Sequence, residues 1–236
     1  MLTLSDSCSK TLHLVLELID EIAPRSSFLL GGGTVLEARW HHRLSTDVDL
    51  FTNEKGMFEF IDPFIRLANS DDWLNRGIRI EQTFAATGVI GNTPHGEFSI
   101  HGNPNIFSNA RTEEEIEGTG IFAQSTPEIL LRKIRARMLR TALYYSRDAY
   151  DVVVATLYAP NELKLVLDSL NVLEKDSLEF DRNRSDLQIR DLEDLIQPKF
   201  PQIVDDLQYF LFDVLTRRVH RDDLLNLLDL DQEFPH

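Results

Sequence analysis

The sequence predicts an α+β protein in which a mixed sheet with flanking helices is followed by a bundle of helices. Strand-like apolar segments are confined to residues 28–124, where Gly, Asn and Pro separate them. From residue 126 onward the apolar residues recur at helical spacing. With 236 residues, 42% of them apolar and 27% charged, the chain can bury a sizeable core. We therefore expect a core domain over residues 1–125 and a helical domain over 126–236.

The first part alternates helices and strands. A helix is expected over 9–23, where apolar residues share one face until Pro24 ends it. A short apolar strand over 28–30 runs into three glycines, and Thr34 then begins a helix through residue 42. A strand over 47–51 and a helix over 57–69, interrupted by Pro63, follow. The remaining predicted strands cover 78–84, 86–91, 96–101 and 119–124.

The second part is predicted to be helical throughout. Thr126-Pro127-Glu128 is a strong helix start, with a capping residue, a proline in the first turn and an acid. The predicted helices cover 127–145, 147–158, 161–173, 188–196, 202–217 and 221–229. On the first of these, an apolar stripe is formed by Leu131, Ile134, Met138 and Ala142. Another face of the same helix carries the basic residues Lys133, Arg137 and Arg140.

Composition narrows the range of functions. The formal net charge of −15 argues against a broad electrostatic grip on nucleic acid, although the basic segment 132–140 is a local exception. A single cysteine, Cys8, excludes a disulfide framework and a cysteine-based zinc site, and it fits a reducing compartment. No apolar run approaches the ~20 residues that a membrane span needs. The expectation is an acidic cytoplasmic protein with no membrane partner.

The segment 28–51 carries the clearest chemistry. Glycines at the end of a strand allow a ligand to approach the backbone, and the following helix start presents free N–H groups that suit a phosphate. On the next strand, Asp47 and Asp49 alternate with apolar residues, so both carboxylates face one side. Two hard oxygen ligands in this position suit Mg²⁺ beside a triphosphate.

Each part of this pattern has a simpler structural explanation. Thr34 and Glu37 have the spacing of a capping box, which closes a helix end without binding a ligand. Glycine turns are common, and a solvated strand edge can carry Asp47 and Asp49. His41 and His42 fit the end of a helix better than a zinc site. The order and spacing of glycines and aspartates together favour the functional interpretation.

The same residues resemble a known family. An apolar residue, two glycines, a spacer and Asp-x-Asp are similar to the signature of the DNA polymerase β nucleotidyltransferase superfamily. The fuller pattern resembles the AbiEii/AbiGii-type branch, which includes the MenT toxins, and consists of Gly32, Gly33, Thr34, Arg43, Ser45, Thr46, Asp47, Asp49 and Phe51. A second block resembles the family in Lys133 and in Arg147-Asp148-Ala149-Tyr150-Asp151. The two blocks together cover the first two thirds of the chain.

The resemblance implies a polymerase-β-like core and a Mg²⁺-dependent enzyme, with Mn²⁺ as a substitute, that moves an NMP from an NTP to an acceptor. The implied acceptor is an RNA, such as the 3′ end of tRNA, or a protein, and the implied role is that of a toxin with a cognate antitoxin. Asp47 and Asp49 would bind the metal. Phosphates would be held by Gly32, Gly33 and Thr34, the last through its N–H and hydroxyl. Further nucleotide contacts are expected from Lys133, Arg137 and Arg140.

The third carboxylate that such enzymes use is left open. Glu97 shares a face with Ser99 and His101 on a predicted strand, and Asp148 is a second candidate. Asp151 is expected to orient or deprotonate the attacking hydroxyl, although it can also serve an ion pair. The alternative function is a catalytically silent relative that binds a protein partner through its acidic, leucine-rich carboxy-terminal helices.

Overall fold

The computed structural model describes residues 1–84, 87–102, 111–184 and 187–230. The chain forms two compact units. The first comprises Met1–Arg39 and Ser45–Ser125, and the second comprises Thr126–His236 together with the short segment Trp40–Leu44. Five residues from the middle of the core sequence therefore belong to the helical unit, which the sequence does not predict.

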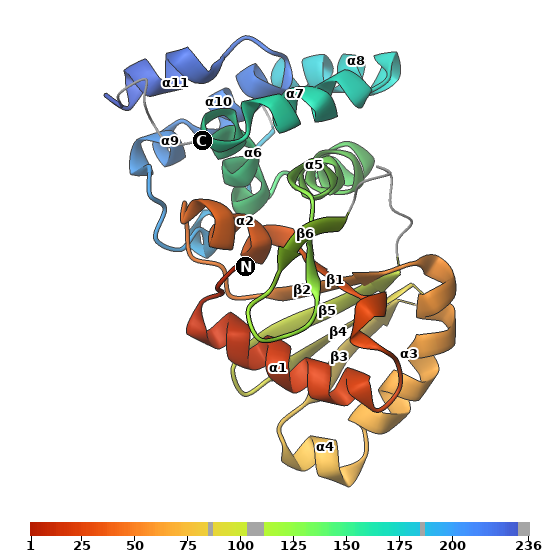
Figure 1. The fold of residues 1–236 in the computed structure, drawn as a ribbon. Helices are drawn as coiled ribbons and strands as arrows, with labels where there is room; N and C mark the ends of the chain where they lie inside the picture. Colours follow the sequence, from red (N-terminus) through yellow and green to blue (C-terminus); the bar gives the residue numbers. More distant parts are fainter. Residues whose placement is uncertain (85–86, 103–110, 185–186, 231–236) are drawn as a thin grey trace. The chain divides into compact units, whose positions relative to one another are not determined.

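The first unit is built on a seven-stranded mixed sheet (Figure 1). Its strand order is β3-β4-β5-β2-β1-β7-β6. The central strand β2 is antiparallel to β1 and parallel to β5, and β1 is parallel to β7. The strands are β1 (Leu29–Gly31), β2 (Val48–Thr52), β3 (Arg79–Phe84), β4 (Gly88–Thr93), β5 (Gly96–Gly102), β6 (Arg111–Glu115) and β7 (Phe122–Gln124).

One face of this sheet forms the core of the first unit. Val48, Leu50, Phe98 and Ile100 alternate along β2 and β5 and are fully buried. Two amphipathic helices, α1 and α3, pack against these strands (Figure 1). The helices of this unit are α1 (Asp6–Asp20), α2 (Gly32–Trp40), α3 (Glu54–Ala68) and α4 (Asp71–Asn75), with the last residue of α2 assigned to the second unit.

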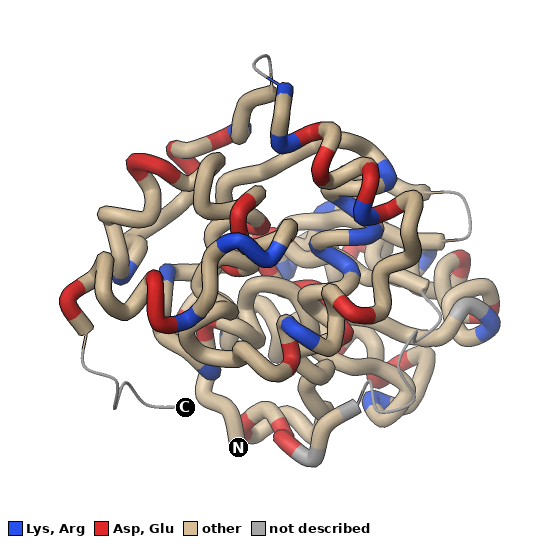
Figure 2. Tube along the Cα trace, turned by 90° about the horizontal axis from the view of Figure 1, so that it is seen from above, with Lys and Arg blue, Asp and Glu red and all other residues tan. Residues whose placement is uncertain are grey.

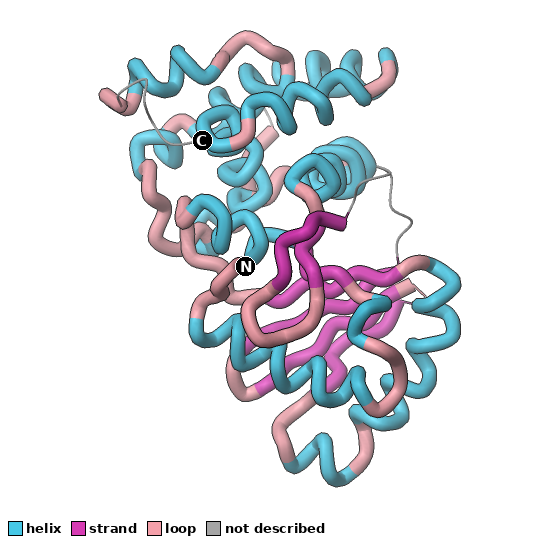
Figure 3. Tube along the Cα trace, viewed as in Figure 1, coloured by secondary structure: helices cyan, strands magenta, loops and turns pink. Residues whose placement is uncertain are grey.

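The second unit is helical (Figure 3). Its centre is α6, in which eleven of the thirteen residues are buried and which packs against α7, α10 and α11. The helices are α5 (Thr126–Leu131), a π-helical continuation (Arg132–Leu139), α6 (Ser146–Tyr158), α7 (Pro160–Ser169), α8 (Val172–Arg182), α9 (Pro201–Asp205), α10 (Leu207–Leu215) and α11 (Arg221–Leu227).

Several predicted elements differ from the structure. The helix expected over 188–196 is wrong: only Leu192–Asp194 form a 3₁₀ turn. Arg190 is held in an extended bridge beside Tyr145, where its backbone bonds to Tyr144 and Ser146. Ala142 is exposed with a positive φ of 52°, so it does not continue the predicted apolar stripe. The sequence also did not predict α4, α8 and β6.

Acidic and basic residues are interspersed along the chain trace (Figure 2). Among the described residues, no helix is long and apolar enough to cross a membrane.

Candidate active site

A glycine turn joins the carboxyl end of β1 to α2. Gly32 has a positive φ of 68°, a conformation that residues with a Cβ rarely adopt. A Cβ on Gly32 would also collide with the Asp49 carboxylate. The turn that begins α2 therefore lies directly beside Asp49. This arrangement suits an anion held between backbone N–H groups and a metal bound by that carboxylate.

Asp49 lies on the sheet face opposite the core, and Asp47 immediately precedes the strand β2 that carries it. Asp49 is half-buried in β2, whereas its neighbours Val48 and Leu50 are fully buried on the other face. Thr46 donates a hydrogen bond of 3.0 Å from Oγ1 to Asp47 Oδ1. Ser99 on β5 donates one of 2.6 Å from Oγ to Asp49 Oδ1. The two hydroxyl groups hold the carboxylates in fixed orientations, and the sequence had not assigned a role to Ser99.

The Thr34 hydroxyl forms hydrogen bonds within the protein. It is fully buried, lies 2.9 Å from Ser45 Oγ and donates to the carbonyl oxygen of Asp47. Cys8 Sγ, whose pKa burial raises, is 3.8 Å away. The hydrogen bond to Asp47 links α2 to the residue that precedes β2. The phosphate contacts predicted for the Thr34 hydroxyl and N–H stay predictions, and in this structure the hydroxyl is bonded within the protein.

The strand register places Glu97, one of the two candidates for the third carboxylate, on the sheet face of Asp49. Ser99 is paired with Asp49, so Glu97, two residues earlier on β5, shares the face of Ser99 beside the start of β2. Glu97 is exposed. Asp148 is 1% exposed and belongs to a cluster of ion pairs in the helical unit.

That cluster is centred on Asp151 of α6, which is fully buried. Arg43 binds it in a bidentate manner, with Nε 2.7 Å from Oδ1 and Nη2 2.9 Å from Oδ2. His42 Nε2 lies 2.7 Å from Oδ1, and Lys133 Nζ lies 3.0 Å from Oδ2. Lys133 Nζ is also 2.6 Å from Asp148 Oδ1, so it bridges the two carboxylates.

Both carboxylates of the cluster are ionised. Burial alone would raise the pKa of Asp151, but the charges of Arg43 and Lys133 outweigh it and hold the pKa well below the usual value. For Asp148, Lys133 and Arg137 likewise outweigh burial and lower the pKa. Arg137 Nη1 lies 3.1 Å from Asp148 Oδ2. Two buried negative charges are thus matched by three cations.

Burial lowers the pKa of His42 more than the Asp151 hydrogen bond raises it. The ring is therefore neutral at pH 7, and the close contact assigns its proton to Nε2, which donates to Asp151. His42 Nδ1 is buried and has no hydrogen-bond partner among the described residues. The sequence suggested a helix end for this histidine and missed its partnership with a carboxylate 109 residues away.

The ion pairs of Asp151 bear on the catalytic role that the sequence predicts for it. Both of its oxygens are bonded to side chains that are themselves buried, so neither faces a substrate hydroxyl. In this structure Asp151 binds His42, Arg43 and Lys133, and its role as a catalytic acid or base stays a prediction. The nucleotide contacts predicted for Lys133, Arg137 and Arg140 remain predictions.

Asp47 and Asp49 suit Mg²⁺ as ligands. Mg²⁺ is commonly bound through one or two carboxylates together with substrate phosphates and water rather than by a complete protein cage. In the described part of the chain, no group of three or more His, Cys, Asp or Glu residues is arranged to hold a metal. Asp49 beside the Gly32 backbone, with Asp47 two residues earlier, suits a site in which substrate phosphates complete the metal coordination.

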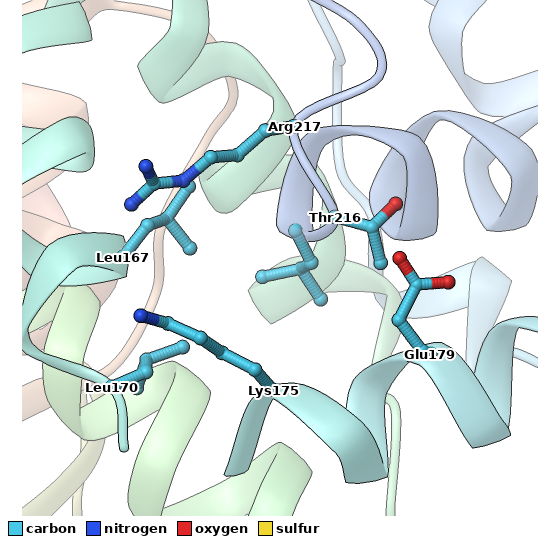
Figure 4. Close-up of a pocket in the computed structure, with 7 residues that line it drawn as sticks. Leu167, Leu170, Lys175, Glu179, Thr216 and Arg217 are labelled. Atoms are coloured by element: carbon cyan, nitrogen blue, oxygen red, sulfur yellow. The ribbon is translucent and has the colours of Figure 1, made fainter. Parts of the chain in front are cut away.

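A pocket in the helical unit is unrelated to this chemistry (Figure 4). It lies between α7, α8 and the end of α10, and Arg217 at its rim pairs with Asp168 at 2.5 Å. None of the predicted site residues lines it. Its lining consists of Leu167, Leu170, Lys175, Glu179, Leu215, Thr216 and Arg217.

A glycine turn set against paired carboxylates at a sheet edge is typical of enzymes that transfer nucleotidyl groups, and the protein is of this class. The family model of the nucleotidyl transferase AbiEii toxin of type IV toxin–antitoxin systems matches residues 15–226. The chain belongs to this AbiEii family. Its members are toxins, which implies a cognate antitoxin for this chain as well.

Comparison with solved structures gives distant matches. JHP933 from Helicobacter pylori is 15% identical, with a TM-score of 0.44 over 96% of this chain and 99% of that one. The antibiotic-resistance factor ANT(2″)-Ia is also 15% identical, with a TM-score of 0.42 over 72% of this chain and 88% of that one. Comparison with curated proteins gives no match.

Proposed function

We propose that this toxin transfers an NMP from a Mg²⁺-bound NTP to a hydroxyl group of an acceptor, preferably the 3′ end of an RNA such as tRNA. The observation that carries the proposal is the contact between the Gly32 backbone and the Asp49 carboxylate. The close approach of the Gly32 turn to Asp49 supports a site in which the turn binds phosphate and the carboxylate binds the metal. In this proposal Mn²⁺ can replace Mg²⁺.

When bound, Mg²⁺ would supply charge neutralisation for the triphosphate and the departing pyrophosphate. Asp47 and Asp49 hold the ligand oxygens that the metal requires, and Ser99 fixes the orientation of Asp49. The N–H groups of Gly32 and Gly33 donate to phosphate oxygens. Catalysis of this kind depends on positioning and electrostatic stabilisation.

In the proposed step, the acceptor oxygen attacks the α-phosphorus and the bond to the β-phosphate oxygen breaks. Pyrophosphate leaves with the electron pair of that bond. The proton of the acceptor hydroxyl passes to the Glu97 carboxylate, which lies on the same sheet face as Ser99. Glu97 takes this role in place of Asp151 because Asp151 is enclosed by its own ion pairs.

The direct test uses purified protein, α-labelled NTPs, Mg²⁺ and total RNA. Labelled RNA is expected from the wild type and not from Asp47→Asn or Asp49→Asn. Asp62→Asn, an exposed carboxylate on α3, is the matched control and should retain activity. Parallel reactions with cell protein in place of RNA distinguish a protein acceptor. Absence of labelled product with all four NTPs and both acceptor pools would refute the proposal.

In the cell, we propose that the transfer takes place in the cytoplasm and arrests growth until a cognate antitoxin counteracts it. Expression of the wild type should stop growth, and Asp49→Asn should abolish this effect. Continued toxicity of Asp49→Asn would instead favour a catalytically silent toxin that acts by binding a partner.

A further inference from the structure

A row of residues crosses the sheet at the level of Asp49. Ser99 on β5 is paired with Asp49 on β2, and Asp49 is paired with Gly31 on β1. Strand β7 lies parallel to β1, with Ala123 paired with Leu30. The next residue along β7 is Gln124, whose side chain lies over Gly31: a Cβ on Gly31 would collide with Gln124 Oε1. Gln124 thus faces the same side of the sheet as Asp49.

The Gln124 amide is an unusual group at this place. The side chain is fully buried, yet neither Nε2 nor Oε1 has a hydrogen-bond partner among the described residues. Burial of a side-chain amide without a partner is unfavourable, and buried polar groups are nearly always bonded. Gly31 leaves room for this amide because it has no side chain, so the arrangement depends on two positions together.

The adjacent row is apolar and aromatic. His101 is paired with Phe51, Phe51 with Leu29, and Leu29 with Phe122. The His101 and Phe51 rings are stacked, with their centroids 5.7 Å apart and an interplanar angle of 28°. Phe51 Cε2 would be 2.7 Å from a Cβ on Gly31. Gln124 therefore lies next to both the row that contains the Asp49 carboxylate and the row that contains the aromatic rings.

We propose that Gln124 binds the nucleoside part of the donor nucleotide and helps to determine which nucleotide is used. An amide offers one donor and one acceptor side, which match a ribose hydroxyl or the edge of a base. A phosphate would match the Nε2 donor alone and be repelled by Oε1. The aromatic row next to Gln124 provides the apolar surface that a base requires, whereas the phosphates belong to the Gly32 turn.

This inference rests on the proposed function, because it assumes an NTP at the Gly32–Asp49 edge. The test is calorimetric titration with Mg²⁺ and each of the four NTPs, their 2′- and 3′-deoxy forms, and inorganic triphosphate. The proteins are the wild type, Gln124→Leu, Gln124→Met and, as the matched control, Gln82→Leu on β3, where the glutamine is exposed. Thermal unfolding of each variant verifies that it is folded.

Gln124→Leu is expected to weaken binding of the preferred NTP by about tenfold, the effect of losing hydrogen bonds to a buried partner. Binding of inorganic triphosphate should be unchanged, and Gln82→Leu should match the wild type for every ligand. A penalty for deoxy forms that disappears in the variant would assign the contact to the ribose. A preference among the four NTPs that disappears would assign it to the base.

Unchanged NTP binding by folded Gln124→Leu and Gln124→Met would overturn the inference and leave the amide with a water partner only. An equal loss for NTP and inorganic triphosphate would overturn it too, because it would indicate a phosphate contact. Both outcomes leave the proposed function intact if the wild type still binds and transfers nucleotides. If the wild type binds neither NTP nor triphosphate with Mg²⁺, the proposed function and the inference fail together.

Discussion

At the scale of single residues, the stability of the helical unit depends on the pairing of its buried charges. Asp151 is enclosed completely and depends on Arg43 for a bidentate ion pair. Removing one partner of a buried pair leaves an uncompensated charge, which is far more unfavourable than losing a surface pair. The stability of the helical unit should therefore depend on Arg43, which is separated from that unit in the sequence.

We expect Arg43→Met to lower the free energy of unfolding by about 3–5 kcal/mol. Chemical denaturation followed by circular dichroism measures this change. Lys164→Met, which breaks the exposed pair with Asp168 on α7, is the matched control and should have little effect. Similar small losses in both variants would show that Asp151 does not need its arginine.

His42 should make stability depend on pH. Its pKa in the folded protein is below its usual value, so the unfolded chain binds more protons as the pH falls through about 6.5. Stability due to His42 is complete above that pH and decreases below it. His42→Gln keeps a donor near Asp151 and removes the titration.

The slope of unfolding free energy against pH between pH 5 and 7 should accordingly be smaller in His42→Gln than in the wild type. A single proton accounts for at most about 1.4 kcal/mol per pH unit. His95→Gln, an exposed histidine in a turn of the first unit, should leave the slope unchanged. Parallel curves for the wild type and His42→Gln would contradict the prediction.

At this scale, the sequence predicted the local relations among the site residues and missed their long-range contacts. The common facing of Asp47 and Asp49 stays a prediction, because Asp47 precedes β2, whereas the shared helix face of Asp148 and Asp151 is confirmed by their contacts with Lys133. The partnership of Asp151 with His42 and Arg43 spans more than 100 residues. No local pattern encodes such a contact, so its discovery required the fold.

At the scale of elements, the turn between β1 and α2 combines two constraints on one glycine. Gly32 needs a positive φ, and its missing Cβ makes room for Asp49. Gly120 has the same kind of φ, 74°, but a Cβ there would meet nothing within 4 Å. The two glycines allow backbone strain to be separated from the close approach to the carboxylate.

Gly120→Ala should destabilise the protein by about 1–2 kcal/mol, the effect of a left-handed residue with a Cβ, and leave nucleotidyl transfer intact. Gly32→Ala should show comparable or larger destabilisation and also lose transfer, because the new methyl group displaces Asp49. Thermal unfolding and the labelled-NTP assay measure the two effects. Full activity of folded Gly32→Ala would contradict this account of the turn.

Helices and strands were predicted correctly where residue propensity and the spacing of apolar residues indicated the same element. The strand, glycine turn and helix over β1 and α2 are confirmed within two residues of their predicted bounds. The helix from Thr126 begins as predicted but becomes π-helical at Arg132, where Lys133 and Arg137 both contact Asp148. Tertiary ion pairs, which a single-helix pattern does not contain, accompany this change in the turn.

At the scale of the whole molecule, the predicted division of the sequence and the observed units differ by one segment. The segment Trp40–Leu44 is grouped with the helical unit, where its backbone bonds to Ile196 and Lys199 and Trp40 stacks on Tyr158. A fragment of residues 126–236 therefore lacks part of its own core. Sequence position alone could not reveal this because the segment is only five residues long.

The fragment 126–236 should fail to unfold cooperatively on heating, since Asp151 loses two of its three partners. Introducing Asp151→Met into the same fragment removes the incompletely paired charge and should restore part of the transition. Differential scanning calorimetry of both fragments and the full chain measures this. A sharp transition in the unmodified fragment would show that Trp40–Leu44 is dispensable.

The two faces of the sheet carry different kinds of side chain. Residues such as Leu50 and Phe98 on one face keep the first unit folded, whereas Asp49, Ser99 and Gln124 on the other contribute polar groups. Because neighbouring positions on a strand alternate between faces, substitutions on the polar face leave the core contacts unchanged. If Gln124 binds the nucleoside as proposed, point mutations at alternate positions of the polar face would change nucleotide preference without altering the scaffold between them.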